Sequence, residues 1–183
     1  MEKRYKIFAE IKTRSIASFN SRDRSRDPKM GSEVEPIPDK LPYIVIIIDE
    51  LADIMMNDVR ANVEISIARI AQKGRAAGIH MIIATQTPRV NILTGIIKAN
   101  IPARIAFRVQ TQVDSRVTLD DGGVEILLGK GDMLFKDAAK NDLRRIQAPL
   151  VLDEDIERVI AQVEKRTEMP SPSIGVLKTL YTI

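Results

Sequence analysis

The chain has 183 residues, which suits one domain with a sizeable hydrophobic core. It lacks cysteine and has one histidine, so disulfides and thiolate metal sites are excluded and a zinc site is disfavoured. Aromatic residues make up 4% of the chain, which argues against broad base-stacking surfaces. No apolar stretch reaches 18 residues and no signal peptide opens the chain, so we expect a soluble, cytoplasmic protein.

The net charge of +3 is unevenly distributed along the chain. Residues 1–30 carry a net charge of +5 and residues 60–116 a net charge of +7, so the remainder is acidic. A basic central segment suggests an anionic partner. Solvated helix faces would explain the same pattern equally well.

The N-terminal segment 1–40 is expected to hold a helix tail and an exposed loop. Tyr5, Phe8 and Ile11 have helical spacing. Residues 20–40 are rich in Ser, Asp, Arg and Pro, as in exposed loops. We expect a core over residues 41–166, and residues 167–183 remain unassigned.

A short apolar strand at 44–48, with the sequence IVIII, precedes Asp49 and Glu50. Continuous Ile and Val without alternation predicts a strand buried on both faces, as in a parallel sheet. Ligands of such sheets bind at the carboxyl ends of the strands, where the two acids lie. An Asp that helps bind Mg²⁺ and a Glu that polarises water occupy this position in P-loop NTPases. Two solvated acids after a buried strand are the simpler alternative.

The following elements alternate between helix and strand. Asn57 and Asp58 offer a cap for a helix over 59–77, with an apolar stripe, and Gly78 ends it. A strand at 79–85 ends in polar residues, a short helix is expected at 91–99, and a strand at 104–109. This alternation predicts right-handed crossovers in a mainly parallel sheet.

The C-terminal part is expected to add an edge hairpin and a last helix. Residues 114–119 and 124–128 are predicted to form short helical turns. Strands at 132–136 and 143–150 flank a polar connection and predict the hairpin. Asp153 is expected to cap a helix over 154–165.

Several motifs, in this order, resemble the motor domain of FtsK/SpoIIIE DNA translocases over roughly residues 1–165: MEKRY, IIIDELADIMM, IARIAQKGRAAGIHMIIATQTP, ILTGIIKANIPARIAF, DSRVTLD and LLGKGDMLF. The resemblance implies a RecA-like P-loop ATPase that uses ATP and Mg²⁺. It also implies a hexameric ring that pumps double-stranded DNA in chromosome partition, cell division or sporulation. Full-length relatives are commonly anchored to the inner membrane.

The resemblance also implies roles for individual residues. Asp49 would help bind Mg²⁺, Glu50 would be the catalytic carboxylate, and Gln86 would sense the γ-phosphate. Arg75 matches a candidate arginine finger, although a surface Arg at a helix C-terminus is favoured in any case. Lys98 and Arg116 match basic positions that contact DNA phosphates.

The chain departs from the family pattern in three places. It contains no GxxxxGK[ST] phosphate-binding loop, which in the family lies upstream of the MEKRY-like segment. It therefore resembles the carboxyl-terminal part of a motor, truncated on the N-terminal side, and we expect no ATP turnover by this chain alone. Thr87 stands where the family usually has Arg, and Gln112 where it often has Lys. Arg89 is a candidate replacement for the first of these charges.

Two alternatives to a motor fragment remain open from the sequence. One is a non-catalytic remnant that binds DNA or joins motor subunits. The other is a relative of conjugative or secretion-type ATPases. The phrase KANIPARIAF favours the FtsK/SpoIIIE family over the second alternative.

Overall fold

The computed structural model describes residues 1–27, 37–56, 60–140 and 142–166. The chain divides into two compact units, Met1–Ile146 and Gln147–Ile183. The capping residues expected at Asn57 and Asp58, and the unassigned segment 167–183, lie outside the described residues. No helix within the described ranges is both long and apolar enough to cross a membrane.

The N-terminal segment forms two helices and a 3₁₀ turn rather than one helix tail. These are α1 (Glu2–Ile11), α2 (Ile16–Asn20) and η1 (Arg24–Arg26). Ser15 caps α2 by accepting a hydrogen bond from the Ser18 N–H at 3.3 Å. Phe8 and Phe19 are buried in one cluster with Ala77 and Ile79. The N-terminal helices are thereby packed against the turn that follows α4.

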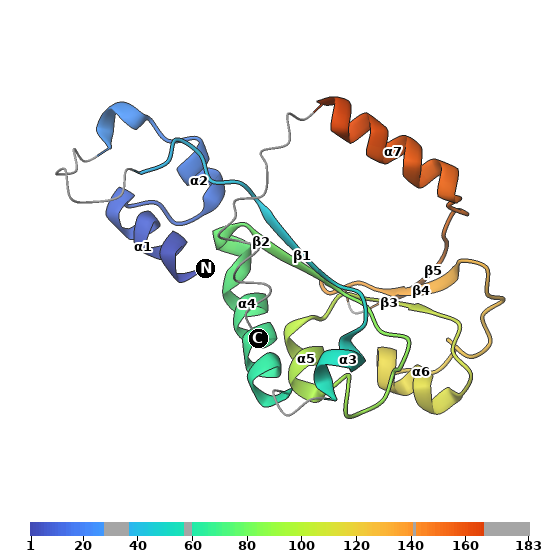
Figure 1. Cartoon of the computed structure of the whole chain (residues 1–183). Helices are drawn as coiled ribbons and strands as arrows, with labels where there is room; N and C mark the ends of the chain where they lie inside the picture. Colours follow the sequence, from blue (N-terminus) through green and yellow to red (C-terminus); the bar gives the residue numbers. More distant parts are fainter. Residues whose placement is uncertain (28–36, 57–59, 141, 167–183) are drawn as a thin grey trace. The chain divides into compact units, whose positions relative to one another are not determined.

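The first sheet consists of two parallel strands, β1 (Ile44–Ile48) and β2 (Ile79–Ile83). Three helices lie on one side of it (Figure 1): α3 (Leu51–Met55), α4 (Arg60–Ala77) and α5 (Gly95–Asn100). The expected helix after β1 is therefore preceded by a short one that the sequence did not indicate. A Cβ at Gly74 would lie 2.9 Å from the Ile79 carbonyl oxygen, so glycine lets α4 approach β2 closely.

The expectation that β1 is buried on both faces is wrong for this chain. Ile46 and Ile48 face the helices and pack against the two cores of this unit. Val45 and Ile47 alternate with them and are exposed, Ile47 to 69%.

The second sheet has the order β3–β4–β5, from β3 (Arg104–Phe107), β4 (Asp132–Lys136) and β5 (Leu143–Gln147). The expected hairpin is confirmed. The expected continuation of the parallel sheet into 104–109 is wrong, because β3 pairs antiparallel with β4 and not with β2. Helix α6 (Gln112–Leu119) contributes Leu119 to a core with Ala106, Val124 and Leu127. The Arg145 guanidinium lowers the pKa of buried Asp132 to about 2 by a 2.7 Å ion pair.

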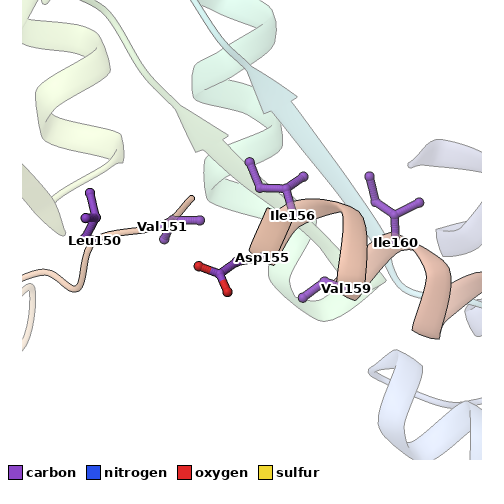
Figure 2. A pocket seen from close by; sticks show the side chains of 6 residues that line it. All are labelled: Leu150, Val151, Asp155, Ile156, Val159 and Ile160. Atoms are coloured by element: carbon purple, nitrogen blue, oxygen red, sulfur yellow. The ribbon is translucent and has the colours of Figure 1, made fainter. Parts of the chain in front are cut away.

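The C-terminal unit contains α7 (Asp153–Arg166), in which Asp153 is the first helical residue rather than its cap. A concavity of about 450 Å³ is lined by the segment before the helix and by its first turns. Figure 2 shows Ile156 and Ile160 projecting from α7 in the same direction. Asp155 is the titratable residue in this lining, and it pairs with Arg158. The lining therefore offers an apolar surface rather than a chemical site.

Candidate functional site

Glu50 lies at the junction of the two parallel strands. The register pairs Ile48 with Ile83, so both strands end at the same edge of the sheet. Past the strands, the Ala84 N–H donates to the Ile48 carbonyl at 2.8 Å and the Leu51 N–H donates to the Ala84 carbonyl at 2.9 Å. These bonds hold the segment after β1 against the segment after β2.

The Glu50 carboxylate accepts three hydrogen bonds. Its Oε1 accepts from the Ala52 N–H at 2.9 Å, which caps α3, and from the Thr85 hydroxyl. Its Oε2 accepts from the Gln86 N–H at 2.7 Å. The sequence-predicted pair of Glu50 and Gln86 is therefore brought together, and Thr85 is the residue that joins them.

Hydrogen bonding keeps Glu50 ionised. The Thr85 hydroxyl, followed by the Gln86 N–H, lowers the pKa of Glu50 below its ordinary value, and burial opposes this only in part. A carboxylate bonded in this way is charged at neutral pH and fixed in direction. To act on a water molecule it must keep a lone pair available or release one of these donors.

Asp49 and the Gln86 side chain are exposed beside this junction. Mg²⁺ in phosphate-transfer sites keeps several waters and takes one or two carboxylates plus phosphate oxygens. An exposed Asp49 fits that mode of binding. Within the described ranges no group of three or more His, Cys, Asp or Glu residues forms a protein-only metal cage. Among the described residues, therefore, no complete protein-only metal site is formed at this junction.

Arg75 lies at the other end of the sheet from Glu50. It occupies the last turn of α4, just before β2 begins, whereas Glu50 contacts the residues that follow β2. A five-residue strand spans about 17 Å, so the structure does not bring these two residues together. Arg75 is exposed, and it lines a cleft of about 390 Å³ together with Met81 and Ile101.

The predicted DNA-contacting residues are in different environments. Arg89 and Arg116 are exposed. The Lys98 side chain is 22% exposed, and its Nζ donates to Asp120 Oδ1 at 2.5 Å. Arg104 donates to the other Asp120 oxygen at 2.7 Å. Lys98 is thus part of an ion-pair cluster of Lys98, Arg104 and Asp120 in which the shared carboxylate is 46% exposed.

Asp120 is the residue in this cluster that sequence reasoning missed. Burial raises the pKa of Asp120, but the hydrogen bonds from Lys98 and Arg104 outweigh it and leave the pKa below its ordinary value. Asp120 has a left-handed backbone (φ 61°) at the C-terminus of α6. An Asp directly before Asp-Gly-Gly is a sequence signal for such a helix end, although it does not identify the partners.

Residues 1–90 match the model of the FtsK/SpoIIIE family. The chain is 51% identical over 173 residues to the DNA translocase SftA of Bacillus subtilis, covering 93% of this chain and 17% of SftA. It is 49% identical to the DNA translocase SpoIIIE of the same species, covering 89% of this chain and 20% of SpoIIIE. It is 47% identical to the DNA translocase FtsK of Streptococcus pneumoniae, covering 92% of this chain and 21% of FtsK. The chain spans about a fifth of the length of these curated relatives.

Solved structures confirm the expected RecA-like P-loop ATPase fold. The monomer form of the pCW3 conjugation coupling protein TcpA with ATPγS matches with a TM-score of 0.69 and 28% identity, covering 89% of this chain and 45% of TcpA. The cytoplasmic domain of the type VII secretion ATPase EccC of Thermomonospora curvata matches with a TM-score of 0.68 and 19% identity, covering 92% of this chain and 19% of EccC. The second match supports the fold alone.

Proposed function

Because the chain belongs to the FtsK/SpoIIIE family, we propose that it forms the part of an ATP-driven DNA translocase that carries the catalytic carboxylate and contacts DNA. The observation that carries this proposal is the junction of Glu50, Thr85 and Gln86 at the shared carboxyl end of two parallel strands. An ionised carboxylate tied to a neighbouring strand can link the state of a bound nucleotide to the rest of the sheet.

Each residue of the junction has a proposed role. When bound, ATP would supply the phosphoanhydride bond and Mg²⁺ would neutralise the charge of its phosphates. Exposed Asp49 is the proposed ligand of the metal in this chain. Glu50 orients and polarises the attacking water. The Gln86 N–H donates to the Glu50 carboxylate, and Gln86 is exposed. A contact between the Gln86 side chain and the terminal phosphate would therefore shift the backbone that holds Glu50.

Arg75 is proposed to act on a nucleotide bound by a neighbouring subunit. Its distance along β2 from Glu50 rules out a role at the same junction in this conformation. An exposed guanidinium can instead reach across a subunit boundary, as arginine fingers do. A homo-oligomeric ring would place each Arg75 at the nucleotide site of the next subunit. The resemblance to the FtsK/SpoIIIE family implies that this ring is a hexamer.

Double-stranded DNA is the proposed polymer substrate. Identities of 47–51% to DNA translocases, against 28% to the conjugation coupling protein, favour a chromosomal DNA motor over a conjugative or secretion-type ATPase. Exposed Arg89 and Arg116 are the proposed contacts, and they would bind phosphates without regard to sequence. Lys98 remains a predicted contact, and it must compete with its bond to Asp120.

Fluorescence anisotropy with labelled duplexes of two unrelated sequences tests the DNA proposal. We expect weak binding that is equal for both duplexes and decreases with salt. Arg116→Ala should weaken binding to both equally and reduce the slope of log affinity against log salt by about 0.9. Lys6→Ala, an exposed cation on α1, is the matched control and should have little effect. Strong preference for one duplex, or equal effects of both variants, would contradict the proposal.

Phosphate release tests the expectation that this chain alone does not turn over ATP. Because the sequence has no GxxxxGK[ST] loop, we expect this chain with Mg-ATP and duplex DNA to release no phosphate above buffer. Release that Glu50→Gln abolishes would show that the chain is a complete catalyst.

A further inference from the structure

Helix α7 has an apolar stripe along one side. Ile156, Val159, Ile160 and Val163 recur at intervals of three and four residues, so they lie on the same face of the helix. Each of these four residues is between 48% and 62% exposed. An exposed apolar stripe of this kind is typical of a helix that packs against a further surface.

The stripe continues into the concavity of about 450 Å³ beside the first turns of the helix. Leu150 and Val151 line this concavity from the segment before α7, and Ile156, Val159 and Ile160 line it from the helix (Figure 2). Leu150 is 83% exposed. The concavity is therefore an open apolar hollow that can receive aliphatic side chains from a second helix.

The charges of α7 differ between its two ends. Residues 153–157 hold four acids and no base, whereas residues 162–166 hold two bases and one acid. The net charge over residues 153–166 is −2. Helices that lie on membranes are rich in Lys and Arg, and DNA also binds cations, so neither surface suits this helix.

We propose that the stripe is covered by α7 of a second copy of this chain, in an antiparallel pair. A two-fold axis between Val159 and Ile160 places Ile156 opposite Val163 of the partner subunit. The same axis places the acidic start of each helix beside the basic end of the other. A parallel pair would instead bring the two acidic ends together, which is unfavourable.

The antiparallel register also fills the concavity. Val163 of the partner subunit lies opposite Ile156 in this register, and it is therefore beside Leu150 and Val151. Asp155, the charged residue of the lining, lies at the end that receives the basic end of the partner helix.

The proposed pair is small and is separate from a ring contact. A helix of 14 residues is about 21 Å long, so we expect reversible pairing rather than a permanent dimer. The contact is isologous, whereas a ring is closed by head-to-tail contacts. The proposal therefore does not depend on the proposed function.

Disulfide formation between single-cysteine variants tests the pair, because this chain contains no cysteine of its own. Ile156→Cys and Val163→Cys chains, one of them with a size tag, are mixed and mildly oxidised. We expect the mixed disulfide to form at least about fivefold faster than either variant forms a disulfide with itself. Faster self-linkage of Ile156→Cys would indicate a parallel pair and would overturn the proposal.

A mixture of Glu154→Cys and Lys165→Cys is the matched control. These positions are also symmetric about the proposed axis, but a rotation of about 100° per residue places them on the opposite face of the helix. We expect this mixture to form its disulfide at least about fivefold more slowly than the Ile156→Cys and Val163→Cys mixture. Equal rates would show random collision and would overturn the proposal.

A charge at the centre of the stripe provides a second test. Ile160→Lys, introduced into both cysteine variants, should slow the mixed disulfide at least about fivefold because it buries a cation in the pair. Ala161→Lys, one residue away and on the other side of the helix, should change the rate by less than about twofold. Circular dichroism checks that both variants keep their helix content, and equal rates in the two variants would contradict the pair.

Thiol labelling distinguishes a second copy from other occupants of the stripe. In the proposed pair, labelling of Ile156→Cys by a small maleimide should become slower as the concentration of the chain rises. Labelling that is equally slow at every concentration would show that one chain covers its own stripe. Labelling that is equally fast at every concentration would show that the stripe stays uncovered, and either result would overturn the proposal.

Discussion

Glu50 is held by a hydroxyl group and two backbone N–H groups, and Thr85 contributes the hydroxyl. Thr85→Val keeps the side-chain shape and removes this donor. The variant should therefore raise the pKa of Glu50 toward its ordinary value of 4.5. Carbon-detected NMR of the Glu50 carboxyl during a pH titration measures this directly. Thr87→Val, in the same turn, is the control, and an unchanged Glu50 pKa in Thr85→Val would contradict the assigned bond.

The hydrogen bond from the Thr85 hydroxyl to Glu50 contributes to the free energy of unfolding in a way that depends on pH. The pKa of Glu50 is lower in the folded chain than in the unfolded chain, so its contribution is complete above the unfolded value of 4.5. It is lost as the pH falls below that value through the folded pKa. In Thr85→Val the loss should cover a narrower pH range, which denaturant unfolding at a series of pH values would show.

Several helix and strand boundaries of this chain follow local signals. The predicted strands at 44–48 and 132–136 have the bounds observed for β1 and β4, and Gly78 ends α4 as expected. The antiparallel pairing of β3 with β4 could not be predicted, because strand pairing depends on contacts distant in sequence. The direction of the Glu50 side chain also depends on Thr85, 35 residues away. Sequence reasoning placed the acids and Gln86 at the strand ends, but it could not show which donors they share.

Gly78 connects α4 to β2 with a left-handed backbone (φ 71°), and a Cβ there would lie 2.4 Å from Ile16 Cδ1. Gly78→Ala combines backbone strain with overpacking against α2, and it should lower the free energy of unfolding by about 2–4 kcal/mol. Gly95→Ala is the matched control, since no atom lies within 4 Å of its added Cβ. Thermal unfolding of both variants measures the difference. Similar unfolding midpoints would show that α2 does not pack against this turn as described.

The N-terminal unit exposes one entire face of its parallel sheet. Tyr43, Val45, Ile47 and Ile82 are each more than half exposed on this sheet. Apolar surfaces of this kind favour association, so we expect oligomers or aggregates at micromolar concentration. Val45→Lys combined with Ile47→Glu should increase the monomer fraction, as measured by size-exclusion chromatography with light scattering. A single monomeric peak for the unaltered chain would contradict this prediction.

The cluster of Lys98, Arg104 and Asp120 lowers the net positive charge of the basic surface. Two cations share one carboxylate, so the cluster carries a single net positive charge where the sequence shows two cations. Each phosphate that a protein neutralises releases a condensed counterion from the duplex, and the number released depends on net charge. In the proposed contact with DNA, this cluster would therefore release about one counterion rather than two. Under the proposed function, Asp120 would therefore compete with DNA phosphates for Lys98 and Arg104, and it would weaken the contact of each subunit with a duplex that moves past it.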